Sequence, residues 1–505
     1  MIVLVGVLSL HLPFVTSDAE ASLGFSRGPW TDEGLYTAQV RNAMRTGTLD
    51  LAESDGVIKE PLFSLFAWGV LSGVGDSLTV MRLAMLALSS VVLALLVAGP
   101  SPLSRAVLVG LPVLALSYYP FHYAHLALVE VTASLLIIAA LWGVQRRLMG
   151  GGAWTFVCSA LLIFLAYSMK VQFVYAAAIP PLAFVLAWGM NVGQWGVGWR
   201  RAAINVAGAS GAAVAFALVF LAGWYWPNRA LMSFVLGAQT SRRSSSWTQL
   251  VHSLADNLHM LATDRRLWAV WLVLLVGLGA AAVAWRAVRR TGIQRGEDAR
   301  QSETERLYVA LMAPPVAWVL IELHKLTLSY LPSRYFLPLV MALGLLGAAG
   351  LYAAWRWGGR SAHQAGRFQP SPWGYAGFAV LMMTLVLDGR DYANAYQRRA
   401  YAVRDAQVRL AADGQWENKL VMGPWAATLF WGSGALTKPV WKDYFNDGDA
   451  IQQLRPVAIV SEPSEDDSEG AFKASGVVLM EPPILTVKVR DWTVNVHGPS
   501  TTPAP

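Results

Sequence analysis

The chain has 505 residues, of which 55% are hydrophobic and only 14% are charged, and it carries 22 tryptophans. Soluble proteins of this size carry ~25% charged residues, so the composition excludes a soluble protein and indicates a polytopic membrane protein. The net charge of +7 comes from the first 387 residues, because residues 388–505 hold 12 basic against 15 acidic side chains. A basic membrane part suits anionic lipid headgroups, and no basic run resembles a nucleic-acid-binding module.

Stretches without Asp, Glu, Lys or Arg predict about eleven transmembrane helices, since roughly 20 apolar residues cross the hydrocarbon core. The stretches are 1–17, 83–104, 106–129, 131–145, 148–169, 171–199, 202–228, 267–285, 307–321, 335–355 and 368–387. The first lacks a basic start and a clear cleavage site, so we interpret it as a retained anchor. The excess of Lys and Arg in alternate short loops places the amino end inside and the first loop, residues 18–76, outside.

The first loop concentrates charge between two apolar segments. It holds the adjacent acids Asp32 and Glu33, a helical pattern over residues 34–45, and Lys59 just before a further apolar stretch. That stretch, residues 61–75, is short and bounded by Pro and Gly, which is typical of a helix lying in the membrane interface. Carboxylates and a lysine gathered at a membrane surface make this loop the first candidate for chemistry.

Isolated charges mark further candidates inside the apolar region. Glu130 is the only acid from residue 77 to residue 255, and Lys170 is the only charge between Arg147 and Arg200. Because a lone charge at membrane depth is costly, each is a functional candidate by default. A short outer turn later in the chain crowds four more such side chains, Glu322, His324, Lys325 and Arg334.

The chain changes character after Asp388, where charges and turn signals become frequent. We expect a small α/β domain outside the membrane over residues 395–497 and a disordered tail over 498–505. Its short strands are predicted within 419–425, 455–462, 476–483 and 484–496. Its acids Glu465, Asp466, Asp467 and Glu469 form a solvated run, so the domain is expected to recognise acceptor or partner rather than to catalyse.

Four short stretches, in this order, resemble the GT-C glycosyltransferases: TDEGLY (31–36), IKEPLFSLF (58–66), YAHLALVE (123–130) and SRYFLPL (333–339). The resemblance is to the branch of protein O-mannosyltransferases and lipid A aminoarabinose transferases, and it covers residues 1 to about 390. It implies a GT-C-like transmembrane catalytic module over 1–390 in the cell membrane. Such enzymes transfer a sugar from a polyprenyl-phosphate carrier to an extracytoplasmic lipid, glycan or protein acceptor.

The resemblance also implies roles for individual residues. Asp32 corresponds to a catalytic carboxylate, Glu130 to the second acidic position, and Lys59 to a neighbour of the carrier phosphate. Two departures are visible: the family more often has Asp where Glu130 stands, and Lys-Pro where this chain has Lys59-Glu60-Pro61.

The reaction itself requires a base for the attacking hydroxyl and cations for the departing phosphate. Asp32 can be the base, with Glu33 and Glu130 as the other catalytic candidates. We expect Asp32 and Glu130 to face one outward-opening cavity. The substrate-binding candidates are Lys59, Tyr36, His125, Lys170, Arg334 and Tyr335.

Structural roles compete with these functional ones. The Asp32-Glu33 pair also suits a solvated helix start, and Glu130 could serve only as an interhelical hydrogen-bond partner. Lys59 could extend to lipid headgroups, and Arg334-Tyr335 could anchor a helix at the interface. The histidines 122, 125 and 324 are more often hydrogen-bonding groups than ligands, although three on one face would permit a divalent metal.

Two functions of other classes stay open at this level. A lipid or oligosaccharide transporter or flippase would also use scattered intramembrane charges, although it needs them along a path through the midplane. An inactive GT-C-like assembly partner would keep the same pattern without turnover. The sugar, the acceptor and any metal are not specified by the sequence.

Overall fold

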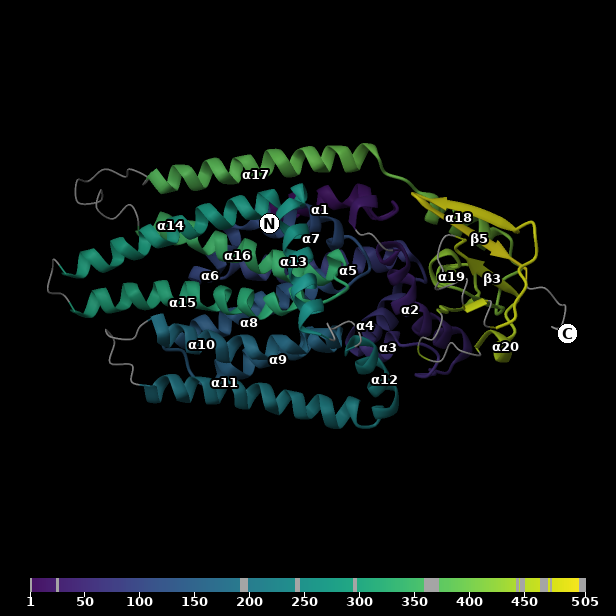
Figure 1. The fold of residues 1–505 in the computed structure, drawn as a ribbon, viewed down its shortest axis with the longest axis horizontal. Coiled ribbons are helices and arrows are strands. Elements are labelled where there is room, and N and C mark those ends of the chain that lie inside the picture. The colour runs from purple at the N-terminus through teal and green to yellow at the C-terminus, as the bar shows by residue number, and fades with distance from the viewer. Residues whose placement is uncertain are drawn as a thin grey trace.

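The computed structural model describes residues 2–23, 27–190, 199–240, 246–293, 298–357, 372–441, 445, 450–463, 471–472 and 475–498. Figure 1 shows long helices packed into one bundle, with a small sheet domain at one end. The expected class, an α-helical polytopic membrane protein with a small C-terminal α/β domain, is confirmed. The acids Glu465, Asp466, Asp467 and Glu469 and the tail beyond residue 498 lie outside the described residues.

Seventeen helices precede the sheet domain in the described part of the chain. They are α1 (Ile2–His11), α2 (Gly28–Thr46), α3 (Gly56–Lys59), α4 (Pro61–Val74), α5 (Leu78–Ala98), α6 (Pro102–Val109), α7 (Tyr118–Ala124), α8 (Glu130–Leu148) and α9 (Trp154–Met169). The remainder are α10 (Ile179–Met190), α11 (Trp199–Phe220), α12 (Arg229–Thr240), α13 (Trp247–Thr263), α14 (Trp268–Ile293), α15 (Asp298–Glu322), α16 (Ser333–Trp357) and α17 (Pro372–Gln397).

Seven segments of the described chain are long and apolar enough to cross a membrane. They are Leu78–Ala98, Glu130–Leu148, Val171–Met190, Trp199–Tyr225, Arg265–Arg286, Glu303–Thr327 and Ser333–Trp357. Three shorter apolar helices, Val5–Phe14, Pro61–Val74 and Trp154–Met169, fall within or next to predicted apolar stretches. The chain is therefore an integral membrane protein, with fewer full-length spans in its described part than the eleven stretches suggested.

One predicted span, residues 106–129, is not a single helix. It is divided into the end of α6, a π-helical turn at Pro112–Leu116 and the short helix α7. Pro112 provides no backbone N–H and crowds the preceding turn, so a regular helix cannot continue through it. The interruption leaves an irregular segment, residues 125–129, just before α8.

Helix α16 forms the centre of the bundle. All of its apolar window is buried inside the protein, whereas only 6% of the window in Trp199–Tyr225 is buried, so α11 faces lipid. Small residues explain the packing: a Cβ on Gly350 would lie 2.1 Å from the carbonyl oxygen of Gly277 in α14. Glycine lets two helix backbones touch, which is a common way to hold membrane helices together.

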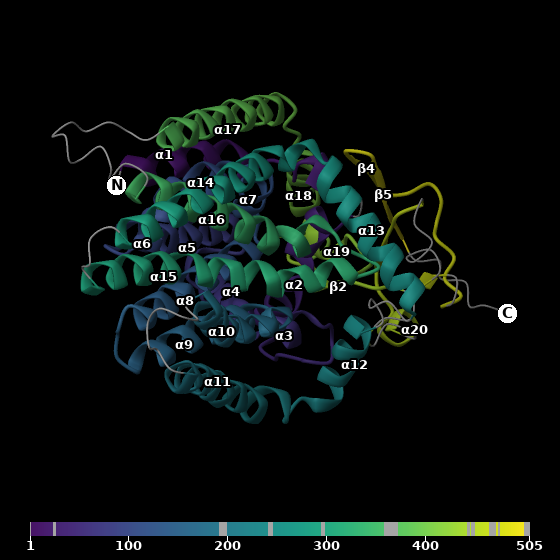
Figure 2. The ribbon, with the colours of Figure 1, turned by 60° about the vertical axis from the view of Figure 1, so that its left-hand side comes forward.

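The first loop folds as the helix α2, whose end agrees with the prediction. Gly47 caps it with a φ of +76°, a left-handed conformation that glycine adopts freely, and donates its N–H to the Ala43 carbonyl. The helix begins at Gly28, six residues earlier than predicted, because Pro29 at its start is already set for helical φ. Helix α4 occupies the predicted interfacial segment, and Figure 2 shows α12 and α13 lying across the same end of the bundle.

The sheet domain contains α18 (Ala402–Ala412), β1 (Leu420–Met422), α19 (Ala426–Leu429), β2 (Leu436–Lys438), α20 (Ala450–Leu454), β3 (Ala458–Ser461), β4 (Leu485–Val489) and β5 (Trp492–His497). The strand order is β2-β1-β3-β5-β4; β1 is parallel to β2 and β3, and β5 is antiparallel to both its neighbours. Three of the four predicted strand regions are confirmed. The region 476–483 forms no strand in its described residues, and β2 was not predicted.

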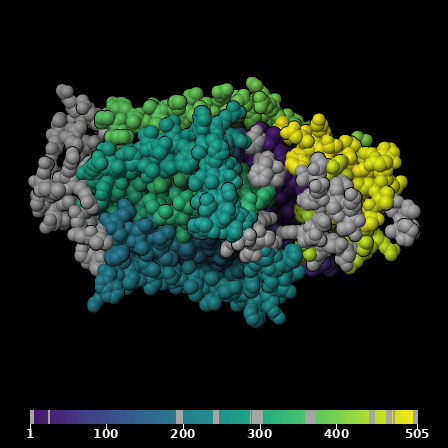
Figure 3. Space-filling view, viewed as in Figure 1, coloured from purple at the N-terminus to yellow at the C-terminus, as the bar shows by residue number. Residues whose placement is uncertain are grey.

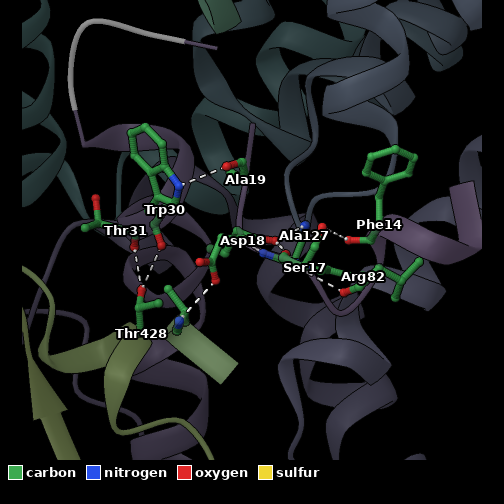
Figure 4. A network of polar contacts seen from close by, with 12 residues as sticks. Phe14, Ser17, Asp18, Ala19, Trp30, Thr31, Arg82, Ala127 and Thr428 are labelled. Atoms are coloured by element: carbon green, nitrogen blue, oxygen red, sulfur yellow. Dashed lines mark hydrogen bonds and ion pairs between the residues drawn. The ribbon is translucent and has the colours of Figure 1, made fainter. Parts of the chain in front are cut away.

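The sheet domain packs directly on α2. Thr428 donates from its hydroxyl toward the carbonyls of Trp30 and Thr31, both at 3.2 Å (Figure 4), and Arg41 donates to the Ala427 carbonyl at 2.6 Å. A Cβ on Gly34 would lie 2.4 Å from the Thr428 hydroxyl, so this close approach requires glycine. The charged helix is consequently enclosed between the membrane bundle and the sheet domain.

Candidate active site

The best catalytic candidate, Asp32, pairs with Arg334. Asp32 lies in the second turn of α2 and Arg334 at the start of α16, and their side chains form an ion pair between Oδ2 and Nη1. Both are almost fully buried, at 5% and 8% exposure. A Cβ on Gly28 would clash with Arg334 Nη1, so glycine at the helix start makes room for the guanidinium. The structure thus brings together two residues that are 302 positions apart.

Glu33 points in another direction, since successive helix residues are rotated by ~100°. Arg82 of α5 binds its two oxygens at 2.8 and 2.5 Å, and the Ala127 backbone N–H donates to it at 2.6 Å. The same guanidinium donates to the carbonyls of Val15 and Ser17, at 3.0 and 2.5 Å. Figure 4 shows this arrangement around Ser17 and Arg82. These contacts tie α2, α5 and two loops together, which favours a structural role for Glu33 over the catalytic one expected.

A second polar cluster lies one turn further along α2. Lys170, at the end of α9, binds Glu130 at 2.9 Å and Glu60 at 2.8 Å, and its ammonium lies 4.4 Å from the centre of the Tyr36 ring. All of these side chains are buried. The pKa of Glu60 is raised from its ordinary value of 4.5 to about 7. Burial is the main cause, and the charge of Glu130 acts in the same direction, while Lys170 opposes both.

Lys59 lies outside this cluster. Lys59 forms an ion pair with Asp55, one turn back on the short helix α3, while the next residue, Glu60, enters the cluster. The cation beside Glu130 is therefore Lys170, which the sequence marked as isolated, and Glu60 is the member that the sequence did not single out. The position of Glu60 directly before Pro61 was the sequence signal that could have identified it. Pro61 starts α4 and so fixes the direction in which Glu60 points.

Helix α2 and the start of α16 join the two clusters. Asp32 and Tyr36 are four residues apart and so lie on the same side of α2. Tyr335 follows Arg334, whose guanidinium lies 5.2 Å from its ring, and its hydroxyl is within electrostatic range of Lys170. The predicted set Asp32, Tyr36, Glu130, Lys170, Arg334 and Tyr335 is therefore one contiguous polar layer. Asp32 and Glu130 are both buried in this conformation, and the outward-opening cavity that they would share stays a prediction.

His125 lies in a different environment from the one expected for a substrate contact. Its Nδ1 is 3.3 Å from His11 Nδ1, and its ring stacks on Phe14, with Phe121 and His122 also in contact. This aromatic cluster packs α1 against α7 rather than adjoining Glu130. Across the described residues, no group of three His, Cys, Asp or Glu side chains is placed to hold a metal ion.

A third buried cluster lies at the turn between α15 and α16. Glu322 accepts from Tyr175 at 2.8 Å and from Trp318 at 2.9 Å, and Lys325 binds it at 2.7 Å. Lys325 also donates to the Tyr175 hydroxyl at 2.7 Å. The sequence flagged this turn as crowded with charge, while Tyr175 carried no signal because it falls in an apolar stretch.

Within these clusters every cation already has a carboxylate partner. The pairs are Arg82 with Glu33, Arg334 with Asp32, Lys59 with Asp55 and Lys325 with Glu322, while Lys170 binds both Glu60 and Glu130. A bound phosphate must therefore compete with a carboxylate for a cation. Three of these carboxylates lie at helix ends: Glu130 begins α8, Glu322 ends α15 and Glu60 precedes α4.

The bundle, the broken span and the sheet domain closed over a layer of buried ion pairs together define a GT-C-like fold. The chain is similar in structure to ArnT from Cupriavidus metallidurans in the apo state, with a TM-score of 0.57 and 16% identity over 98% of this chain and 97% of ArnT. ArnT bound to undecaprenyl phosphate matches over the same shares, with a TM-score of 0.54 and 16% identity. The Archaeoglobus fulgidus oligosaccharyltransferase matches 91% of this chain and 69% of its own at 11% identity, but its TM-score of 0.48 supports no argument. No family model and no curated protein matches the sequence.

Proposed function

We propose that the protein is an integral-membrane glycosyltransferase that takes a sugar from a polyprenyl-phosphate carrier and passes it to an extracytoplasmic acceptor. The observation that carries the proposal is the buried Asp32 and Arg334 pair, beside a lysine held by two glutamates. A carboxylate and a guanidinium in a desolvated layer are what a reaction needs when it takes up a proton and releases a phosphate.

Asp32, Arg334 and Lys170 take part in the proposed transfer step. The acceptor O–H gives its proton to Asp32, the acceptor oxygen bonds to the anomeric carbon of the sugar, and the bond from that carbon to the carrier phosphate oxygen breaks. The electron pair of that bond leaves with the phosphate, whose charge Arg334 and Lys170 stabilise.

The ion pair supplies a way to couple donor binding to base activation. In the resting state Arg334 neutralises Asp32 and makes it a weak base. A donor phosphate that binds Arg334 withdraws the guanidinium from Asp32, which frees the carboxylate to take a proton. Solvent exclusion around this pair is consistent with its low exposure, and it would limit transfer of the sugar to water.

The ArnT structure with undecaprenyl phosphate supports the choice of carrier, since a protein of this fold holds that lipid. The positions of the charges argue against transport. Four buried charges lie at helix ends: Glu130 begins α8, Lys170 follows α9, Glu322 ends α15 and Arg334 lies at the start of α16. A layer at one membrane face suits a reaction there better than passage across the membrane.

To test the proposal, purified protein is incubated with a panel of polyprenyl-phosphate sugars that are labelled in the sugar. Membranes from the producing cells are added as the source of acceptor. Transfer of one label, lost in the Asp32→Asn variant, is the expected result. Export of intact lipid across sealed vesicles without transfer would favour a transporter, and no consumption of any donor by the wild-type protein would favour an inactive assembly partner.

A further inference from the structure

A cleft of about 820 Å³ lies between α2 and the sheet domain, away from the buried ion pairs. One wall is formed by the carboxyl half of α2 and the loop after it, and the other by β1, β2 and α20. Its polar lining includes Asn42, Thr46, Asp50, Glu53 and Lys438. In Figure 3 the N-terminal residues, in purple, reach the surface between the helical bundle and the sheet domain.

We propose that this cleft binds the glycan portion of the acceptor, an inference that rests on the proposed glycosyltransferase function. The lining offers hydrogen-bond acceptors in two carboxylates, donors in one ammonium, and both in an amide and hydroxyls. A polyhydroxylated ligand needs donors and acceptors close to one another. Leu420, Leu436 and Leu454 provide apolar surface for the C–H faces of sugar rings. A concave site with converging polar groups on an apolar floor is the usual form of a small-ligand site.

Glu53 is the group most suited to recognise hydroxyls. It accepts from the Asn42 amide, and its backbone carbonyl accepts from Lys438, so its side chain is fixed in the cleft wall. Burial raises its pKa to about 7, so near neutral pH the carboxyl both donates and accepts hydrogen bonds. Perturbed carboxyl groups of this kind concentrate at binding sites.

A peptide acceptor fits the cleft less well. β2 is the edge strand of the sheet, and a peptide would pair with its free backbone groups. Asn42 already occupies the middle of that edge: its Oδ1 accepts from the Thr437 N–H at 3.0 Å, and its Nδ2 donates to the Thr437 carbonyl at 2.9 Å. Strand addition is therefore blocked where it would begin.

The cleft is connected to the reaction centre along α2. Asp32, Tyr36, Gln39, Asn42 and Thr46 follow one another at spacings of three or four residues, so they share one side of the helix. Ten residues separate Asp32 from Asn42, which is a rise of ~15 Å. Gln39 holds the chain that flanks this polar stripe, donating to the Asp50 carbonyl and accepting from the Val57 N–H, both at 2.9 Å. Between the cleft and Asp32 the stripe is buried, so α2 fixes the position of the cleft relative to the reaction centre.

The experiment measures two products from a donor labelled in its sugar, with membranes of the producing cells as acceptor source. One product is label joined to a macromolecular acceptor, and the other is free sugar released to water. We expect Glu53→Gln and Lys438→Met to lower the ratio of the first to the second by about fivefold or more. Asp50→Asn changes an exposed side chain of the cleft, and we expect a smaller fall of about twofold.

Matched controls lie on the same domain outside the cleft. Glu417→Gln and Lys419→Met remove the same charges from exposed positions and should leave the ratio unchanged. An unchanged ratio in all three cleft variants would overturn the inference, and so would a labelled product that protease converts to small peptides. A wild-type protein that consumes no donor would instead overturn the proposed function itself.

Discussion

Two adjacent carboxylates of α2 are paired with arginines in very different ways. Glu33 accepts hydrogen bonds from Nε and Nη2 of Arg82 and from the Ala127 backbone N–H. The Nη1 of Arg82 donates to the carbonyls of Val15 and Ser17. Each nitrogen of this guanidinium therefore has a protein partner. Such a saturated pair holds elements in place and has nothing left for a substrate.

The neighbouring pair is less complete. Arg334 binds Asp32, but within the described residues its Nε has no hydrogen-bond partner, although it is buried. Buried donors without partners are costly, so their presence in a folded protein calls for a ligand or a water molecule. The contrast favours a structural role for Glu33 and Arg82 and supports the proposed reactive role of Asp32 and Arg334.

The largest expected effect comes from Asp32→Asn. The amide keeps the shape but cannot take a proton, and a general base contributes ~10²–10⁴-fold, so turnover should fall by that factor. Because the substitution also frees Arg334, binding of polyprenyl phosphate should become severalfold tighter. Transfer rates and carrier affinity measured in the same detergent preparation test both parts. Turnover near that of the wild type would remove Asp32 as the base and leave Glu130 as the next candidate.

Glu33→Gln should instead act on stability. Breaking a buried ion pair by removing one partner costs about 3–5 kcal/mol, so the thermal unfolding midpoint should drop strongly. The surviving folded molecules should still turn over within about tenfold of the wild type, because no reacting group is lost. Unfolding and activity measured on the same sample separate these outcomes. A stable but inactive variant would reverse the roles of the two carboxylates.

A comparison of two lysines sharpens the same distinction. Lys170→Met removes the cation that binds both Glu60 and Glu130 and that stabilises the departing phosphate, so turnover should fall by about 10²–10³-fold. Lys59→Met removes the partner of Asp55, outside that cluster, and should lower turnover less than tenfold. Steady-state rates at saturating donor decide this. Equal losses in both variants would restore Lys59 as a phosphate contact.

The sequence predicted the composition of the site better than its pairings. Isolation in an apolar stretch identified Glu130 and Lys170, whereas Asp32 was found in a charged loop and Arg334 near a turn crowded with charge. Which cation meets which carboxylate depends on how distant helices pack, and no local pattern encodes that. The pairing of Lys59 with Asp55 was therefore not foreseen, and Glu60 was missed although it is the adjacent residue.

The fold was predicted unevenly for a related reason. Long apolar stretches such as Ser333–Trp357 specify helices by themselves, because an apolar segment in lipid must satisfy its backbone internally. The broken segment before Glu130 is apolar too, so its composition concealed the interruption at Pro112. The three-residue strand β2 depends on pairing with β1 and on Asn42, and isolated residues give no sign of either.

The smallest expected effect is the pH dependence produced by Glu60. Its pKa is raised from 4.5 to about 7, so the folded protein holds a proton that the unfolded chain releases in this interval. Stability contributed at this site is therefore highest at low pH, and it should decline as pH rises from about 4.5 to about 7, by roughly 3 kcal/mol, and level off above that. Glu60→Gln cannot titrate, so its unfolding midpoint should lack this component. Glu53, whose pKa is also near 7, is present in both proteins and cancels from the difference between them.

The contradicting outcome is a difference in stability between the wild type and Glu60→Gln that stays flat from pH 5 to pH 8. It would mean that Lys170 keeps Glu60 ionised throughout, and the cluster would then hold two charged carboxylates around one ammonium.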